Sequence, residues 1–114
     1  MPRNIAYLLD ILLYAKEIRD FMAGIDRAAF LFDHKTQYAV IRCFEVIGEA
    51  AKRISDDVRK GHPDIPWSSM AKMRDLLIHA YDRVDIDEVW DTVQNDIPKL
   101  ITALEGIVPS EDKS

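Results

Sequence analysis

The sequence predicts an all-α domain, folded as an up-down bundle of four main helices with short helical turns between them. Three observations support this prediction. The 114 residues include only four glycines and five prolines, so long stretches lack the residues that end helices. In several of these stretches apolar side chains recur with a period of about 3.6 residues. Val, Ile and Thr do not gather in the short alternating runs that are typical of strands.

The sequence of the N-terminal half of the chain predicts two long helices separated by a short one. The first runs from about residue 4 to 23, with Asn4 as its N-cap. A helical turn follows over residues 26–32, and a second long helix over residues 35–54 with an apolar stripe. This second helix also has small residues that would let another helix approach closely, namely Gly48, Ala50 and Ala51.

The sequence of the C-terminal half of the chain predicts two further long helices. Residues 55–61 read as a turn or short helix, and residues 62–66 as a rigid loop, because each of its prolines disfavours helix in the preceding residue. A helix follows over about residues 67–81. The last helix is capped at Asp85 or Asp87, runs to about residue 107 and is bent at Pro98.

Length and composition indicate one domain, which we place at residues 1–108, followed by a disordered tail at 109–114. Hydrophobic residues make up 48% of the chain and charged residues 31%, which fits a globular protein rather than a disordered or membrane protein. Cys43 is the only cysteine; its position in an apolar stripe favours a structural thiol. A single cysteine is typical of a reducing, cytoplasmic location. We expect no signal peptide and no membrane span.

The charge pattern points to the middle of the chain. The net charge of −5 argues against a broad nucleic-acid surface. Residues 51–83, however, contain seven Lys and Arg against five Asp and Glu, and they are the only net-positive third. A local anion site is therefore expected there.

Arg74 is the first candidate for such a site. It falls on the apolar stripe of the helix at 67–81, together with Trp67, Met70, Leu77 and Tyr81. A guanidinium on an apolar stripe is costly unless it has a partner. That partner is either an acidic residue of the long helix, such as Glu45 or Glu49, or a bound phosphate.

His79 is the second candidate. It lies four residues after Asp75, so the two should face each other, and the carboxylate would orient the imidazole and raise its pKa. Arg74 is five residues from His79, about 140° around an ideal helix. The two share a site only if their side chains converge, if the helix loosens near Tyr81, or if a groove between two subunits brings them together.

An arginine and a histidine are a minimal set for cutting RNA without a metal. The imidazole can take the proton of the 2′-hydroxyl or protonate the leaving oxygen, and the guanidinium can hold the phosphate. The competing interpretation is a structural ion-pair cluster, which is the more frequent role of such residues on helices. The chain has no glycine-rich phosphate loop and no cysteine-based metal motif, so we expect no cofactor and no metal.

A resemblance to a known family favours the catalytic interpretation. The motif Arg74-Asp75-(three residues)-His79-Ala80-Tyr81 resembles the R-polar-x3-H-x-Y pattern of HepT-like toxins in the HEPN superfamily. The resemblance extends over nearly the whole chain. It includes three flanking segments, at residues 47–52, 65–67 and 89–98.

The resemblance implies a homodimer, with higher-order assembly left open, in which both motifs face a shared cleft. It implies metal-independent RNA cleavage by Arg74 and His79, with Asp75 and Glu49 supporting the site. It further implies a minimal nucleotidyltransferase antitoxin that adenylylates Tyr81 and so blocks the cleft. Asp75 stands where such motifs often have Asn; its carboxylate can orient His79 and can also repel an RNA phosphate.

Three functions therefore compete. The first is an endoribonuclease toxin silenced by its antitoxin. The second is a non-catalytic helical partner subunit of a nucleotidyltransferase. The third is a helical dimerisation module without a ligand. Cleavage of RNA by the purified protein separates the first from the other two.

Overall fold

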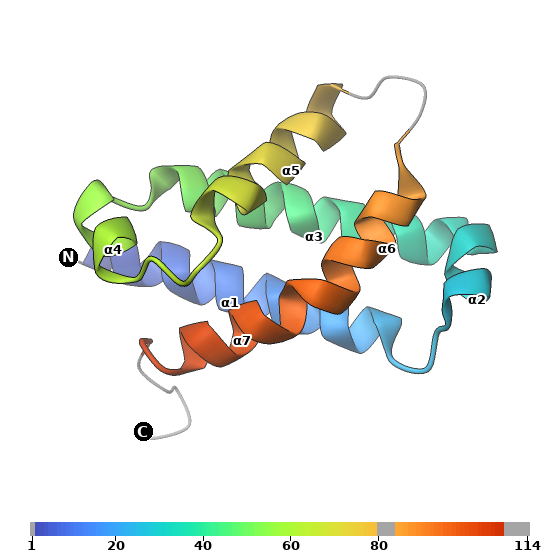
Figure 1. The fold of residues 1–114 in the computed structure, drawn as a ribbon, viewed down its shortest axis with the longest axis horizontal. Coiled ribbons are helices and arrows are strands. Elements are labelled where there is room, and N and C mark those ends of the chain that lie inside the picture. The colour runs from blue at the N-terminus through green and yellow to red at the C-terminus, as the bar shows by residue number, and fades with distance from the viewer. Residues whose placement is uncertain (1, 80–83, 109–114) are drawn as a thin grey trace.

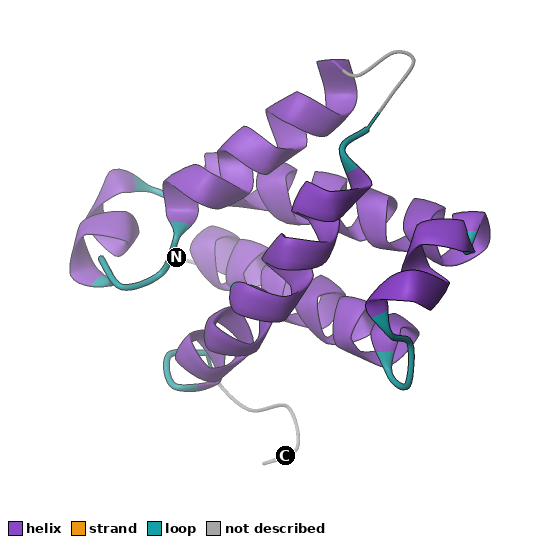
Figure 2. Ribbon diagram, turned by 45° about the vertical axis from the view of Figure 1, so that its right-hand side comes forward, coloured by secondary structure: helices purple, strands orange, loops and turns teal. Residues whose placement is uncertain are grey.

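The computed structural model describes residues 2–79 and 84–108, with side chains for residues 4–77 and 84–108. Within these residues every element is a helix, which confirms the all-α prediction (Figure 2). The helices are α1 (Pro2–Met22), α2 (Arg27–Phe32), α3 (His34–Arg53), α4 (Asp56–Gly61), α5 (Trp67–His79), α6 (Ile86–Asn95) and α7 (Ile97–Glu105).

The long helices α1 and α3 run side by side in opposite directions, and α5 packs on the other side of α3 (Figure 1). The α6–α7 pair crosses over them, with α7 packed against α1. The core lies between these layers. Its largest fully buried side chains are Phe30, Ile11, Ile18, Ile47, Leu100, Leu104, Val40 and Val89.

The N-terminal residues differ from the prediction in one respect. The first helix begins at Pro2, so Asn4 is not its N-cap but lies inside α1. The Asn4 side chain instead binds the segment after α3: the Ser55 backbone N–H donates to Asn4 Oδ1 at 3.1 Å, and Asn4 Nδ2 donates to Ser55 Oγ at 3.1 Å. Asn4 therefore joins the start of α1 to the end of α3.

Aspartate caps set the starts of α2 and α3. Asp26 accepts from the backbone N–H of Ala29 at 2.8 Å, as expected for the predicted helical turn. Asp33 accepts from the backbone N–H of Thr36 at 3.0 Å, so α3 begins at His34. His34 is the first residue of α3 and is exposed.

The last predicted helix is in fact two helices. Asp85 caps α6 by accepting from the Glu88 N–H at 3.1 Å, as predicted. At Asp96, however, α6 ends and α7 begins, with Pro98 in the first turn of α7. Proline has no N–H and fixes its own φ, which is tolerated at the start of a helix and costly inside one. Pro98 thus starts a new helix instead of bending a continuous one.

The two tryptophans and the cysteine contribute to the packing of the helices. Trp67 is buried, and its indole N–H donates to the His62 carbonyl at 3.0 Å, which holds the loop before α5. Trp90 is half-buried and lies 5.7 Å from Phe30, measured between ring centroids. Cys43 is buried, and desolvation raises the pKa of its thiol to about 11. This agrees with a structural role for Cys43.

No helix in the described parts of the chain combines the length and apolar character needed to cross a membrane.

Candidate functional site

The candidate site lies where α5 crosses α3, and Gly48 makes this crossing possible. Gly48 is buried, and a Cβ placed on it would lie 2.1 Å from the Cβ of Arg74 and 2.9 Å from the Met70 carbonyl oxygen. No side chain fits at these distances. The predicted close approach of a second helix to the small residues of α3 is therefore confirmed at Gly48, and the residue that it meets is Arg74.

Arg74 is held by two carboxylates. Its Nη2 lies 3.0 Å from Glu49 Oε1, and its Nη1 lies 3.3 Å from Asp75 Oδ1. Of the two acidic residues considered as partners from the sequence, Glu49 is the one found, whereas Glu45 pairs with Arg42 at 3.4 Å. A guanidinium has five N–H groups, so Arg74 retains donors for a further anion. Its side chain is 26% exposed, which leaves these donors accessible.

Each of these carboxylates also binds a second cation. Glu49 Oε2 accepts from Nε and Nη2 of Arg53 at 3.2 and 2.9 Å, and Asp75 Oδ1 accepts from Lys52 Nζ at 2.9 Å. We call these five side chains the α3–α5 charge network: Arg53, Glu49, Arg74, Asp75 and Lys52.

The network shifts the titration of both acids. Hydrogen bonding to Arg53, followed by the charge of Arg74, holds the pKa of Glu49 below its usual value. Hydrogen bonding to Lys52, and then to Arg74, does the same to the pKa of Asp75. Both acids therefore stay ionised at neutral pH. Since three cations surround two carboxylates, the network keeps a net positive charge, and the charge of Asp75 is offset by Lys52.

Of the other two predicted site residues, His79 is described in its backbone alone. His79 is the last residue of α5, so Arg74 and His79 lie on one helix. The side chain of His79 is outside the described side chains, and the expected Asp75–His79 contact stays a prediction. Tyr81 lies outside the described residues, as does the tail at 109–114.

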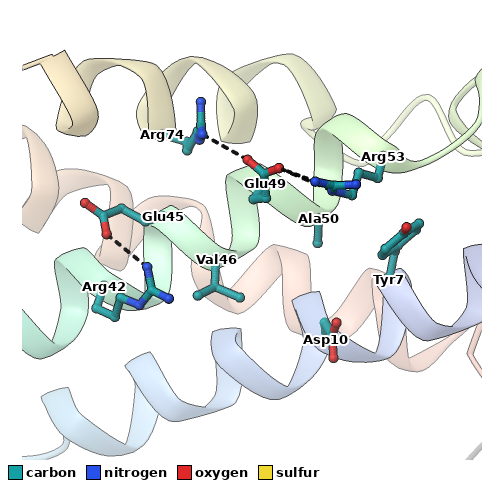
Figure 3. A pocket seen from close by; sticks show the side chains of 9 residues that line it. All are labelled: Tyr7, Asp10, Arg42, Glu45, Val46, Glu49, Ala50, Arg53 and Arg74. Carbon is teal, nitrogen blue, oxygen red and sulfur yellow. Dashed lines mark hydrogen bonds and ion pairs between the residues drawn. The ribbon is translucent and has the colours of Figure 1, made fainter.

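A pocket of about 380 Å³ opens beside Arg74, between α1 and α3 (Figure 3). Its walls come from α1, α3 and Arg74 of α5. The lining residues are Tyr7, Asp10, Arg42, Glu45, Val46, Glu49, Ala50, Arg53 and Arg74. Among the described residues, no group of three or more His, Cys, Asp or Glu is arranged to hold a metal ion.

Sequence reasoning missed part of this pocket. The charged side chains of α3 could have been found, because Arg42, Glu45, Glu49 and Arg53 follow one another at spacings of three and four and so share a helix face. Tyr7 and Asp10 gave no such signal. They join the site only because α1 packs antiparallel to α3, a tertiary contact that the local pattern does not contain.

Comparison with known proteins identifies the class to which this fold and site belong. Residues 11–107 match the family described as Ribonuclease HepT-like. The chain belongs to this HEPN-type ribonuclease family, which confirms the resemblance seen in the motif and its flanks.

Named relatives agree with the family. A Thermococcus cleftensis protein named "Probable ribonuclease HepT" is 52% identical over 94 residues, which are 82% of this chain and 86% of that protein. A Methanocaldococcus jannaschii protein, provisionally named an RNase, is 45% identical over 103 residues, 90% of this chain and 89% of that protein. A Caldanaerobacter subterraneus protein with a similar provisional name is 34% identical over 105 residues, 92% and 94% of the two chains.

No solved structure gave a significant match to the chain. The family and its relatives nevertheless support an RNase function, because the aligned segments cover most of both chains.

Proposed function

We propose that the protein is a metal-independent endoribonuclease toxin, in which Arg74 and His79 act on RNA and a nucleotidyltransferase antitoxin silences the site by adenylylating Tyr81. The observation that supports this proposal best is the placement of Arg74. Its guanidinium is oriented by Glu49 and Asp75, remains partly exposed, and lies five residues before His79 on the same helix.

Arg74 would bind the scissile phosphate. A guanidinium forms paired hydrogen bonds with phosphate oxygens, and its charge stabilises the additional negative charge of the transition state. Glu49 and Asp75 fix the side chain before the substrate arrives, which lowers the cost of orienting it. Lys52 and Arg53 compensate for the two carboxylates, so the phosphate meets a net-positive environment.

His79 would move the protons. A neutral imidazole takes the proton of the 2′-hydroxyl as this oxygen attacks phosphorus, and a protonated imidazole gives a proton to the departing 5′-oxygen. The products are a 2′,3′-cyclic phosphate and a 5′-hydroxyl, and no water or metal enters this step. In a homodimer with the two motifs in one cleft, the histidine of each subunit would take one of these roles.

Adenylylation of Tyr81 would stop this chemistry. Tyr81 is two residues after His79, so an attached AMP would place bulk and negative charge beside the phosphate site. The substrate is itself an anion, so the added phosphate would repel it. The partner in this proposal is a cognate minimal nucleotidyltransferase, with ATP as the donor of the adenylate, and both proteins would act in the cytoplasm.

Cleavage of a transfer RNA mixture in EDTA tests the proposal. Wild-type protein should produce fragments with cyclic phosphate ends, while His79→Ala and Arg74→Lys should be at least about a hundredfold slower. Arg74→Lys is the sharper variant because it keeps the charge and loses the paired geometry. Circular dichroism should show equal helix content in all three proteins.

Each alternative predicts a different result. Equal cleavage by wild type and His79→Ala would place the activity elsewhere. Absence of cleavage by unmodified wild-type protein, together with stable binding to the nucleotidyltransferase, would favour the non-catalytic partner subunit instead.

A further inference from the structure

The pocket beside Arg74 has no role in the cleavage chemistry, although it opens next to the proposed phosphate site (Figure 3). Of its nine lining residues, only Arg74, Glu49 and Arg53 take part in the proposed chemistry or its support. Its volume of about 380 Å³ falls within the range of small-molecule sites, roughly 300–1,000 Å³. A nucleotide whose phosphate lies on Arg74 would therefore have this pocket within reach of its base.

The charges of the lining argue against a second phosphate inside. Three arginines and three carboxylates line the pocket, so their formal charges cancel. A phosphate placed between them would lie close to acidic groups as well as basic ones. A neutral ring with both donors and acceptors on its edge fits such a lining better, because it can use both kinds of group without a net charge of its own.

The pocket also offers surfaces for an aromatic ring. Val46 and Ala50 contribute apolar surface from α3, and Tyr7 contributes its ring from α1 (Figure 3). Single-stranded RNA is commonly read in this way, with an unstacked base placed on an aromatic side chain and hydrogen-bonded along its edge.

The side chains that could read the edge of a base are those outside the charge network. Arg53 already uses two donors on Glu49. Arg42 and Glu45 are joined by one contact at 3.4 Å, so each retains hydrogen-bonding capacity. Asp10, which lies near Tyr7 on α1, supplies further acceptors from its carboxylate (Figure 3). Both carboxylates therefore offer acceptors to a ligand in the pocket.

We propose that this pocket binds the base of the RNA nucleotide whose phosphate lies on Arg74, with Glu45 accepting a hydrogen bond from an exocyclic amino group. Carboxylates accept from amino groups such as cytosine N4, which uracil lacks. The pocket thus favours cytosine over uracil. This inference rests on the proposed RNase function for its substrate, but binding can be measured without cleavage.

Nucleotide binding to the purified protein provides the test. Methyl NMR signals of Val46 and Ala50 are followed during titration with CMP, UMP and ribose 5-phosphate, which has no base. CMP should bind about tenfold more tightly than UMP or ribose 5-phosphate, and only the nucleotides should shift the two methyl signals. Equal binding of all three, binding of none, or unmoved methyl signals would overturn the proposal.

A charge-removing substitution in the pocket adds a second readout. Glu45→Gln keeps the size of the side chain and replaces an acceptor oxygen with a donor, so the preference for CMP over UMP should fall to about one. Binding of ribose 5-phosphate should stay at the wild-type level. Glu88→Gln removes the same charge from α6, outside this pocket, and should retain the preference. An unchanged preference in Glu45→Gln would contradict the assignment.

The outcomes separate this inference from the proposed function. Base-selective binding without RNA cleavage would leave the pocket assignment intact and refute the RNase proposal. RNA cleavage without base-selective binding would do the reverse.

Discussion

The two faces of α3 are stabilised in opposite ways. One face carries Val40, Phe44 and Ile47, which are buried. Phe44 and Ile47 line a small cavity together with Ile97 and Leu100 of α7. The other face carries a row of charged side chains that line the pocket or belong to the charge network. Gly48 lies at the boundary, where α5 rests directly on the backbone of α3.

This difference separates stability from function. Apolar burial removes water from hydrocarbon and contributes strongly to the free energy of unfolding. Exposed ion pairs contribute little, because water already solvates both charges. We infer that the apolar face of α3 contributes most of its stabilising energy, whereas its charged face serves to bind a ligand.

The largest expected effect is on the apolar face. Ile47 is 1% exposed, so Ile47→Ala should lower the free energy of unfolding by about 2–5 kcal/mol through lost burial and a cavity. Urea unfolding followed by circular dichroism measures this loss. Leu13→Ala, at a side chain that is 52% exposed, is the control and should cost much less. Similar losses for the two variants would remove the distinction between core and surface.

The next effect is at the boundary. Gly48→Ala puts a methyl group against Arg74 Cβ and the Met70 carbonyl, so α5 must move away from α3. Overpacking of this kind costs about 1–3 kcal/mol. RNA cleavage should fall by more than the loss of folded protein explains, because the movement displaces Arg74 from Glu49.

Gly61→Ala is the matched control for Gly48→Ala. Gly61 is also helical, no atom lies within 4 Å of an added Cβ, and its φ is not positive. This variant should be neutral or slightly stabilising, since alanine favours helix. A Gly48→Ala protein with wild-type stability and cleavage would show that the close crossing is not needed.

The apolar face was also the easier one to predict. The 3.6-residue period predicted α3 within one residue at each end and the burial of Cys43, and the small residues of this helix predicted the close approach at Gly48. Two details failed because they depend on neighbours. Asn4 has the chemistry of an N-cap but bonds to Ser55, and Pro98 starts α7 because Asp96 ends α6 just before it.

The charged face was predictable only in outline. An arginine on the apolar stripe of a helix requires a charged partner. This requirement reduced the candidate partners of Arg74 to two glutamates or a phosphate. The choice of Glu49 over Glu45 depends on where α5 crosses α3, which the sequence does not specify. Tyr7 and Asp10 were not predicted at all, because their place in the pocket follows from the packing of α1 on α3.

A smaller effect should appear at Cys43 on the apolar face. Burial raises the pKa of its thiol from 9.0 to about 11, so its stabilising contribution is complete below pH 9 and is lost as pH rises towards 11. The unfolding midpoint of the wild type should therefore fall, relative to that of Cys43→Ala, as pH rises from 8 to 10.5. At pH 8 the native thiol should react about a hundredfold more slowly with a disulfide reagent than the unfolded one.

The smallest effect on stability should come from the charge network, where the effect on cleavage is nevertheless large. Glu49→Gln keeps the shape of the side chain and removes the charge that orients Arg74. The urea midpoint should stay near that of wild type, while kcat for RNA falls about tenfold with little change in KM, because the lost orientation matters most in the transition state. Glu105→Gln breaks a distant ion pair with Lys16 and should leave both quantities unchanged.

The pH dependence of the same reaction sharpens this last comparison. The pKa values of Glu49 and Asp75 are lowered in the folded protein, so the network is complete above the usual carboxylate range and is lost only as pH falls below it. The acid limb of the cleavage profile between pH 5 and 7 should therefore reflect another group, which we assign to His79. If Glu49→Gln moved that limb, Glu49 would itself titrate during cleavage, and it would be part of the proton transfer instead of a residue that positions Arg74.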